Sequence, residues 1–323
     1  MSRDTPNPAG LACDICSSTS ATTLFEATDH REQLGGLFRV ARCDECGLVR
    51  TEPQPDDLDA WYPDEYRNHA AKEPLTVKVI GRALRYTARP LRREGVARML
   101  SWALPNAAVG PTLRHKARVL DVGAGNGSAV AALRAADVDG WGVEPSATAV
   151  ASAHARGVQT VLAGTMETTE LAREKWDLIR FTHVLEHVPS PVATLRTAAG
   201  ALRPGGRIVI LVPNFGGAGR RLFGKSWDGL EVPRHLHHFT ARTLERAFTA
   251  AGLRATSLRT AALFGVIPSS IDAWTSGGAR QRGWGTSLLV RVPIYPVDLA
   301  LASIGLGEGL LAVAVPTETG APT

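Results

Sequence analysis

The fold is decided by one stretch of the sequence, Arg118-Val119-Leu120-Asp121-Val122-Gly123-Ala124-Gly125-Asn126-Gly127-Ser128. A short apolar run there meets three alternating glycines and is followed by an alanine-rich segment with helical periodicity. Glycine adopts positive φ angles without steric cost and lets a ligand approach the backbone, and Ser128 is a suitable N-cap for a helix over residues 129–136. The stretch therefore predicts a strand, a nucleotide-binding turn and a helix.

Asp121 indicates which kind of nucleotide the turn binds. The dinucleotide fingerprint G-x-G-x-x-G does not fit, because the spacing is G-x-G-x-G and Ser128 stands where the last glycine or alanine belongs. The carboxylate would also repel a phosphate, by about 4 kcal/mol for charges about 4 Å apart at an effective dielectric constant near 20. It favours a cationic ligand, and S-adenosylmethionine carries a sulfonium, an ammonium and no phosphate. The alternative is a tight strand-to-helix connection in another kind of α/β protein.

The composition is that of an ordinary globular protein. The chain has 323 residues, of which 44% are hydrophobic and 21% are charged, enough for one large domain with additions. The net charge of +5 is spread along the chain, so it gives only weak support for nucleic-acid binding. Residues 1–10 contain no apolar signal-peptide core, and no apolar run is long enough to span a membrane. We therefore expect a cytoplasmic protein without a transmembrane segment.

All four cysteines lie near the N-terminus, as Cys13-x-x-Cys16 and Cys43-x-x-Cys46. Each pair can bind a metal ion from a tight turn, and two pairs provide the four thiolates of a structural zinc site. Residues 22–40, between the pairs, fit the hairpin of a zinc ribbon. Two disulfides or four unrelated thiols are the alternatives, but no secretory signal favours oxidation.

Two segments connect this module to the glycine turn. Residues 53–74 are rich in proline, aspartate and aromatic residues, among them Trp61, Tyr62 and Tyr66, which either cap the edge of the core or cover the cofactor pocket. Residues 75–104 have helical periodicity and many arginines. These predict a solvated helix face, with a membrane surface or an anionic partner as the alternative. The arginines are Arg82, Arg85, Arg89, Arg92, Arg93 and Arg98.

Strands and helices alternate after the glycine turn. We predict strands over residues 140–144, 159–163, 176–182 and 207–212, with helices over residues 146–156 and 191–202. This alternation predicts a parallel sheet covered on both faces, with ligands at the carboxyl ends of its strands. Glu144 ends the second strand about 20 residues after Gly123, where nucleotide-binding folds place an acidic residue that binds ribose hydroxyls.

Two histidine-rich motifs follow the fourth and fifth strands. The first, His183-Val184-Leu185-Glu186-His187-Val188-Pro189, contains the metalloprotease signature H-x-x-E-H, but that signature needs a continuous helix, which Pro189 and Pro191 exclude. The second, Pro233-Arg234-His235-Leu236-His237-His238-Phe239-Thr240, precedes a helix that Thr240 caps. Three histidines in four positions beside an arginine favour a site that removes a proton from an acceptor.

Together, the motifs resemble those of class I S-adenosylmethionine-dependent methyltransferases. The motifs that carry the resemblance are residues 120–127, 183–189, 203–206 and 226–240. They are most similar to bacterial zinc-ribbon methyltransferases of natural-product and polysaccharide pathways, over residues 13–252 with a weaker match over 307–315. The resemblance implies a seven-stranded Rossmann-like sheet whose last strand is antiparallel, with its sixth and seventh strands over residues 254–262 and 310–315.

The resemblance also implies which residues bind the cofactor. Glu144 would hold the ribose diol, Met166 would neighbour the adenine, and the glycine turn would surround the methionine and ribose. The full expected set is Asp121, Gly123, Gly125, Gly127, Glu144, Met166 and Thr182.

Catalysis is expected to depend on the histidines. In the resembling families a histidine of the pattern H-x-x-x-F matches His235, so His235 is the first candidate for the general base, ahead of His238, His237 and His187. Ubiquinone-pathway O-methyltransferases and small-RNA 2′-O-methyltransferases are similar in having E-x-x-E-H and a later histidine, which hold a divalent cation. Here His183 replaces the first glutamate. A second divalent metal at His183, Glu186 and His187 is therefore one hypothesis, and a structural role in the turn is the other.

These expectations divide the chain into five parts. They are a zinc-ribbon module (1–52), a connector and helical cap (53–110), a Rossmann-like core (111–262), an insertion (263–309), and the last strand with a tail (310–323). The insertion is longer than a hairpin needs, which favours a contact with substrate or a homodimer contact. Trp274, Trp284, Leu288 and Leu289 would suit either.

The expected function is methyl transfer from S-adenosylmethionine to a hydroxyl or activated carbon of a small-molecule acceptor. A zinc-ribbon rRNA methyltransferase is one alternative, but it would require clustered basic residues interleaved with aromatic ones, so we do not expect a nucleic-acid partner. A non-catalytic methyltransferase-like binding protein is the other, and the intact glycine turn and histidines disfavour it. The sequence does not distinguish O-, N- and C-methylation.

Overall fold

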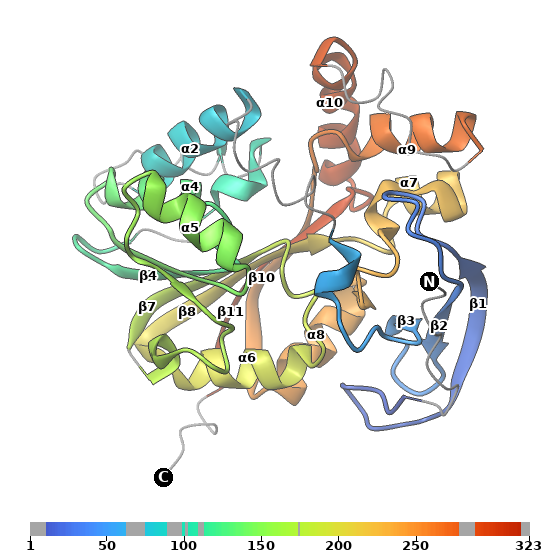
Figure 1. Cartoon of the computed structure of the whole chain (residues 1–323), viewed down its shortest axis with the longest axis horizontal. Helices are drawn as coiled ribbons and strands as arrows, with labels where there is room; N and C mark the ends of the chain where they lie inside the picture. Colours follow the sequence, from blue (N-terminus) through green and yellow to red (C-terminus); the bar gives the residue numbers. More distant parts are fainter. Residues whose placement is uncertain are drawn as a thin grey trace.

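Two sheets organise the molecule (Figure 1). The computed structural model describes residues 11–62, 75–88, 99–100, 103–108, 113–173, 175–277 and 288–317. The larger sheet has seven strands, and the smaller has four and contains the N-terminal segment. The carboxyl ends of the parallel strands point toward the smaller sheet, so the two halves of the molecule meet where ligands are expected (Figure 1).

The seven-stranded sheet has the order β10-β11-β8-β7-β4-β5-β6. Its parallel strands are β4 (Arg118–Val122), β5 (Asp139–Glu144), β6 (Val161–Ala163), β7 (Trp176–Thr182) and β8 (Leu202–Pro213). Strand β11 (Gly309–Pro316) lies antiparallel between β8 and β10 (Leu253–Ala261). The predicted sheet with an antiparallel last strand is confirmed. Of the predicted bounds, those of β8 differ most, because the strand begins at Leu202.

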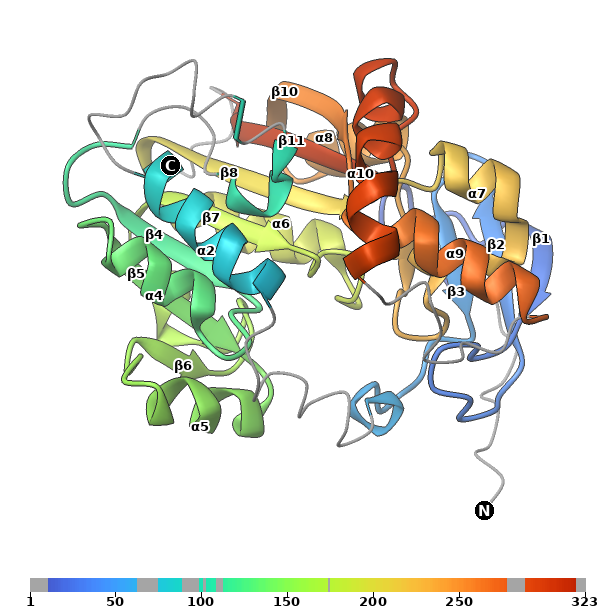
Figure 2. The same cartoon turned by 90° about the horizontal axis from the view of Figure 1, so that it is seen from above.

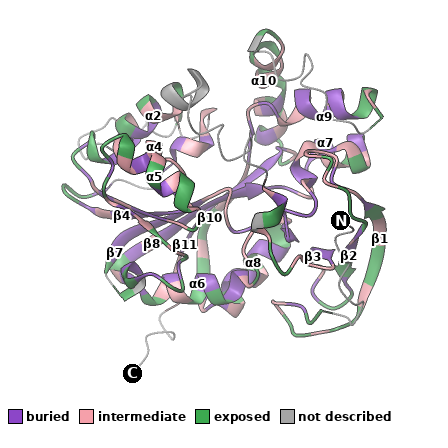
Figure 3. Ribbon diagram, in the orientation of Figure 1, coloured by how far each residue is buried: buried purple, intermediate pink, exposed green. Residues whose placement is uncertain are grey.

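Helices cover both faces of this sheet (Figure 2). Ile179 and Ile210 belong to one core cluster with α6 (Pro191–Gly200) and α8 (Ala241–Ala250), whereas Leu178 and Leu211 belong to another with α2 (Leu75–Ala88) and α4 (Ser128–Arg134). Helix α5 (Ala147–Ala155) packs on β5 and β6. Both faces of the sheet are buried along the central strands β7 and β8 (Figure 3), and residues 208–213 of β8 accordingly form a continuous apolar run, whereas β7 also carries Asp177 and Arg180.

Helix α4 begins differently from the prediction. Gly127 is its N-cap, with a left-handed φ of 74°, and Ser128 is the first helical residue. The backbone N–H and the hydroxyl of Ser128 donate to Asn126 Oδ1 over 3.2 Å and 2.7 Å. The prediction that Ser128 caps this helix is therefore wrong, because Gly127 takes the left-handed conformation there and Asn126 accepts from the first helical residue.

The four-stranded sheet joins the cysteine-bearing module to the second histidine motif. Strands β1 (Ala21–Ala27) and β2 (Phe38–Cys43) form the expected hairpin, and β3 (Val49–Glu52) follows. The fourth strand, β9 (His237–His238), comes from the histidine motif and pairs antiparallel with β3. A contact distant in sequence thus completes the sheet.

The connector and the arginine-rich segment are described in part. The rings of Trp61 and Phe38 pack edge to face, with their centroids 5.2 Å apart. Both residues belong to the core cluster that packs against the small sheet. Arg82 and Arg85 on α2 are at least partly exposed, as expected for a solvated face. Tyr66, Arg89, Arg92, Arg93 and Arg98 lie outside the described residues.

The insertion contains two helices, α9 (Val266–Thr275) and α10 (Leu288–Ser303). Helix α9 packs against α7 (Ala218–Phe223) and α10 (Figure 2). Trp274 and Leu289 are exposed, whereas Trp284 lies outside the described residues. In the part of the chain that the structure describes, no helix combines the length and the apolar character needed to cross a membrane.

Candidate active site

A cavity of about 370 Å³ lies at the carboxyl ends of β4 and β7, beside the glycine turn. Four of the seven expected cofactor residues line it: Asp121, Gly123, Gly125 and Thr182. Helix α2 covers it with Ile80, Gly81 and Leu84. Helix α2 lies within the segment expected to form a connector and helical cap (53–110). The sequence motifs did not indicate which of its residues would line the cavity, because the contact joins segments about 40 residues apart that have no shared pattern.

The three glycines of the turn have different roles. Gly125 has a φ of +54° and no atom within 4 Å of the place where a Cβ would stand, so its backbone is open to a ligand. Gly123 has a φ of +69°, and a Cβ there would overlap Val184 of the first histidine motif. Gly127 caps α4, and a Cβ would come within 3.1 Å of Ala153. Close packing therefore requires glycine at 123 and 127, whereas Gly125 leaves room for a bound molecule.

Glu144 and Met166 are not among the residues that line the cavity. The Glu144 carboxylate accepts hydrogen bonds from the backbone N–H of Gly125 at 2.9 Å and of Ser146 at 3.0 Å, so it fixes the shape of the glycine turn. Met166 is 1% exposed and belongs to the main core. The roles of both residues in cofactor binding stay predictions.

Arg180 is a lining residue that the sequence motifs missed. It lies opposite Asp121 in the register of β4 and β7, and its Nη1 is 3.3 Å from Asp121 Oδ1. Burial raises the pKa of the Asp121 carboxyl above its usual value, although the charge of Arg180 opposes the shift. One signal was available in the sequence: an arginine among the apolar residues Leu178, Ile179 and Phe181 of a predicted central strand. A buried charge usually has a specific partner or ligand.

A second group of side chains follows β7, where Glu186, His187 and His235 come together. One ligand atom from each lies within 4.8 Å of the others. Glu186 and His235 are buried, and the rings of His187 and His235 meet edge to face with centroids 4.6 Å apart. Burial acts to raise the pKa of the Glu186 carboxyl, but the neighbouring imidazoles outweigh it and hold the pKa below its usual value. The group therefore presents a carboxylate between two imidazoles.

Hydrogen bonds through Nδ1 orient both imidazoles. His235 Nδ1 lies 2.9 Å from the carbonyl oxygen of Gly229. His187 Nδ1 lies 3.0 Å from the carbonyl oxygen of Arg234 and 2.9 Å from the hydroxyl of Tyr62. Carbonyl oxygens only accept hydrogen bonds, so in the neutral form of each imidazole these contacts assign the proton to Nδ1 and leave the lone pair on Nε2. Burial, followed by the charge of His235, lowers the pKa of His187 to about 4.

Of the other candidate histidines, His237 and His238 make hydrogen bonds outside this group, and His183 lies at its exposed edge. His237 Nε2 is 3.2 Å from the carbonyl oxygen of Pro189, and His238 Nε2 is 3.0 Å from the hydroxyl oxygen of Thr51. Burial lowers the pKa of both residues. His183 is about one-third exposed, and its Nδ1 lies 3.6 Å from Glu186 Oε1. Of the four histidines first considered for catalysis, the structure brings together His235 and His187.

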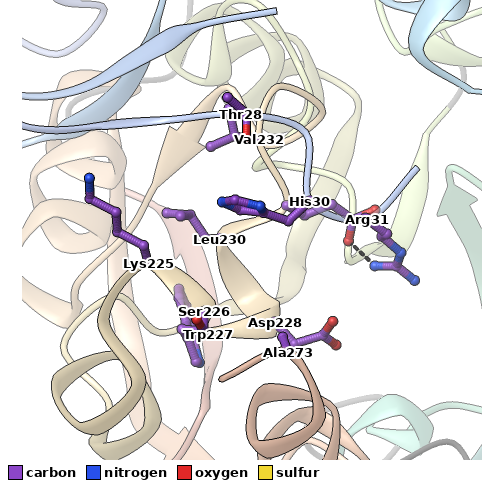
Figure 4. Close-up of a pocket in the computed structure, with 11 residues that line it drawn as sticks. Thr28, His30, Arg31, Lys225, Ser226, Trp227, Asp228, Leu230, Val232 and Ala273 are labelled. Carbon is purple, nitrogen blue, oxygen red and sulfur yellow. Dashed lines mark hydrogen bonds and ion pairs between the residues drawn. The ribbon is translucent and has the colours of Figure 1, made fainter. Parts of the chain in front are cut away.

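A buried ion pair anchors the loop that carries His235 to the N-terminal module. The guanidinium of Arg234 donates to both carboxylate oxygens of Asp29, at 2.7 Å and 3.1 Å, and both side chains are fully buried. Arg31 forms a second pair with Glu231. A small cavity of about 40 Å³ lies next to this second pair, between Thr28, His30, Lys225 and Ala273 (Figure 4). The module therefore fixes the position of the second histidine motif.

The four cysteines converge on one point. The Sγ atoms of Cys13 and Cys46 are 3.3 Å apart, those of Cys16 and Cys43 are 3.6 Å apart, and all four lie within 4.8 Å of one another. A tetrahedral zinc site with Zn–S bonds of about 2.3 Å needs sulfur atoms about 3.8 Å apart. The four sulfur atoms therefore fit a zinc ribbon.

Comparisons with known proteins agree with this architecture. The family model described as "Methyltransferase domain" matches residues 89–258, just over half of the chain. The chain is 32% identical over 160 residues to the ubiquinone biosynthesis O-methyltransferase of Xanthomonas euvesicatoria. The match covers 47% of this chain and 66% of that protein, so it spans just under two thirds of the relative's length. It is 36% identical over 107 residues to the enzyme of the same name from Marinobacter nauticus, covering 30% and 44%.

A solved structure shares the fold. It is a chain from the complex between the Haloferax volcanii Trm112 methyltransferase activator and its methyltransferase, with a TM-score of 0.51 at 19% identity, covering 82% of this chain and 99% of that chain. The family match covers more than half of the chain, and the sheet has the order expected for the class I fold. The protein therefore belongs to the S-adenosylmethionine-dependent methyltransferases, as a member of the methyltransferase domain family.

Proposed function

We propose that the protein transfers the methyl group of S-adenosylmethionine to a small-molecule acceptor beside Glu186, His187 and His235. The observation that carries the proposal is the Glu186 carboxylate, which is buried and has no hydrogen-bond partner on either oxygen among the described residues. Leaving such a group unpaired is costly, so it usually serves a ligand or a reaction. Glu186 lies only four residues after Thr182, and Thr182 lines the cofactor cavity.

The cavity beside the glycine turn suits this cofactor. S-adenosylmethionine supplies an electrophilic methyl group on a sulfonium. Asp121 provides negative charge in the cavity, which favours a cationic ligand and disfavours a phosphate. Gly125 leaves the backbone open to a close approach, and Glu144 holds the turn in place. Helix α2 covers one side of the cavity with Ile80, Gly81 and Leu84.

His235 is suited to remove a proton from the acceptor. Its Nδ1 proton faces the Gly229 carbonyl, so the lone pair of Nε2 faces the cluster. The carboxylates of Glu186 and Glu231 lie 4.0 Å and 3.7 Å from Nε2 and would stabilise the imidazolium that forms. A hydroxyl or a carbon acid must lose a proton as it attacks, so this base would promote the reaction.

The same cluster fits a divalent cation. Glu186, His187 and His235 offer one carboxylate oxygen and two imidazole Nε2 atoms, and the carbonyl contacts of both Nδ1 atoms are those usual for histidine ligands. His183, expected from the sequence in such a site, lies at the exposed edge of the cluster. A divalent cation held there would lower the pKa of an acceptor hydroxyl.

Two observations support a small acceptor with a hydroxyl group or an activated carbon. Glu186 and His235 are buried, which suits a small molecule better than a nucleic acid that needs an exposed basic surface. The two curated relatives described above are named ubiquinone biosynthesis O-methyltransferases, which favours the hydroxyl. We also propose that Cys13, Cys16, Cys43 and Cys46 hold one structural zinc ion.

His235→Ala tests the catalytic role. We expect turnover of a small-molecule acceptor to fall by about 10² to 10⁴, because a general base is lost, while the Kd for S-adenosylhomocysteine stays unchanged. The matched control is His115→Ala, because His115 is an exposed histidine that pairs only with the exposed Asp137 among the described residues. Full turnover in His235→Ala, or loss of cofactor binding, would remove His235 from this role.

Metal dependence and acceptor class are measured on the wild-type protein. Turnover that is lost on dialysis against EDTA and restored by Mg²⁺, with zinc content constant, supports a divalent cation at the cluster, whereas constant turnover supports the metal-free base. Methylation of bulk RNA without methylation of any small molecule would support the RNA alternative. Failure to bind S-adenosylmethionine in calorimetry would support the non-catalytic one.

A further inference from the structure

Helix α10 presents an apolar face to the solvent. Five of its exposed side chains recur at the spacing of helical turns, so they lie on one side of the helix: Val292, Pro293, Pro296, Val297 and Ala300. Val292 and Val297 are 58% and 55% exposed. The helix packs against α9 and β10 with its other side. A surface helix normally has polar residues on its outer side, so this α10 face indicates a binding surface.

Exposed apolar side chains on the neighbouring helices extend the α10 face. Ile304, directly after α10, is 69% exposed, and Trp274 on α9 is 62% exposed. Leu222 on α7 is 75% exposed. Helix α9 packs against both α7 and α10, which brings these side chains to one region. Tryptophan is enriched where a membrane meets water, because its ring is apolar and its N–H is polar.

The charges on these helices are of one sign. Helices α2, α7, α9 and α10 contain only two acidic residues, Asp272 and Asp298, and both are buried. Three arginines are exposed on the same helices: Arg82 and Arg85 on α2, and Arg221 on α7. The described side chains of the four helices therefore present positive charge and no negative charge to the solvent.

Helix α2 lies beside the α10 face. The hydroxyl of Tyr295 on α10 donates a hydrogen bond to the carbonyl oxygen of Ala103, and α2 packs against the turn at Pro105–Ala107 that follows. Helices α2, α9 and α10 lie on the side of the molecule that is uppermost in Figure 1 and faces the viewer in Figure 2. The exposed arginines of α2 thus flank an apolar surface.

The combination of apolar and basic side chains determines which partner fits. An anionic lipid surface offers an apolar layer for the α10 face and phosphate groups for the arginines. A second copy of the chain would bring a second set of these arginines to the same interface, where like charges repel.

We propose that the protein docks on the surface of a membrane that contains anionic lipids. The α10 face and Trp274 lie at the boundary between headgroups and acyl chains, and Arg82 and Arg85 contact lipid phosphates. Docking of this kind needs no helix that crosses the membrane.

Binding to lipid vesicles tests the proposal. The full-length protein is sedimented with vesicles of phosphatidylcholine alone, or of phosphatidylcholine and phosphatidylglycerol in equal amounts. We expect it to bind the anionic vesicles on the order of 10- to 100-fold more tightly, and rising salt should weaken that binding. The assay contains no acceptor or cofactor, so its result does not depend on the proposed function.

Two sets of variants separate the apolar contribution from the charged one. Val292→Asp combined with Val297→Asp should weaken binding to anionic vesicles at least about tenfold, because apolar contact is lost and negative charge is added. The control is Leu37→Asp, because Leu37 is 51% exposed in the N-terminal module. Arg82→Gln and Arg85→Gln should each weaken binding about fivefold, whereas Arg196→Gln on the exposed face of α6 should not.

Three outcomes would overturn the proposal. One is equal binding of the wild-type protein to both kinds of vesicle, or binding to neither, a result that needs no variant to fold. Another is wild-type binding by the variant with aspartates at positions 292 and 297, provided that its unfolding temperature matches that of Leu37→Asp. The third is a concentration-dependent dimer that this variant abolishes, in a protein that binds no vesicles, because the α10 face would then be covered by a second copy.

Discussion

The cysteine cluster and the Glu186 cluster both bring metal-ligand atoms within 4.8 Å of one another, but the protein completes them differently. The four sulfur atoms are of one kind, and two similar turns present them, each closed by a hydrogen bond to the first cysteine's carbonyl oxygen from Ser17 at 2.7 Å or Gly47 at 2.9 Å. The Glu186 cluster mixes a carboxylate with two imidazoles and leaves the carboxylate without a hydrogen bond from the described residues. A closed site of four thiolates suits structure, whereas an open site of mixed donors suits chemistry.

The two clusters are nevertheless mechanically linked. Strand β3, which follows the second cysteine pair, donates from Thr51 N to the carbonyl oxygen of Leu236 at 3.0 Å and from the Thr51 hydroxyl to that of His235 at 2.7 Å. At the other end of the module, Asp14 accepts from Val192 N at 2.7 Å and from the hydroxyl of Ser190, so it caps α6. The cysteine-bearing module therefore supports the loop that carries His235, and disrupting the module should affect both clusters.

The largest expected effect comes from Cys43→Ser. Zinc binding contributes about 10 to 16 kcal/mol of apparent folding energy to small zinc modules, so this variant should lose its metal, unfold at a lower temperature and lose turnover. The wild-type protein should contain one zinc per chain by elemental analysis, released by a chelator as the four thiols become alkylable. Thr19→Ala is the control, because Thr19 is an exposed residue near the first cysteine pair. No zinc or two zinc ions in the wild-type protein would contradict the assignment.

A smaller and more selective effect is expected from Glu186→Gln. The change keeps the size of the side chain, and the Glu186 carbonyl oxygen still accepts from Leu236 N at 2.8 Å and His237 N at 3.1 Å. Turnover should fall by about 10² to 10⁴, while zinc content and the unfolding temperature stay close to those of the wild type. Glu245→Gln on the exposed face of α8 is the control. A fall in unfolding temperature as large as that of Cys43→Ser would mean that the second cluster is structural too.

The seven-stranded sheet could be predicted because its signals are local. Most of the parallel strands contain a short apolar run, and a helix of recognisable period follows each of β4, β5 and β7. The glycine turn needs positive φ angles at all three glycines, and the sequence shows that requirement directly. The cysteine spacing worked for the same reason, since each pair forms its own turn.

The second histidine motif shows what sequence spacing does not predict. His235, His237 and His238 are close in sequence, but His237 and His238 belong to β9, where successive side chains point to opposite faces of a strand. Only His235, which precedes the strand, joins Glu186 and His187. The pairing of β9 with β3 decides this outcome, and it depends on a contact between segments almost 190 residues apart.

The smallest expected effect concerns Asp298, a second buried carboxyl group that contrasts with Glu186. Burial, followed by the charge of Glu308, raises the pKa of Asp298 to about 7, whereas imidazoles keep Glu186 ionised. Because the folded state binds the Asp298 proton more tightly than the unfolded state does, the contribution of Asp298 to stability should be fully present at acidic pH and be lost as the pH rises toward 7. Asp298→Asn keeps an acceptor for the backbone N–H of Leu263. The free energy of unfolding, measured with urea, should fall between about pH 5.5 and 8 in the wild type, and the variant should show a fall that is smaller by about 1 to 2 kcal/mol. The exposed Asp56→Asn should leave that loss unchanged. An identical pH dependence in Asp298→Asn would show that Asp298 is ionised in the fold, and a buried ionised carboxylate would then no longer distinguish the Glu186 cluster.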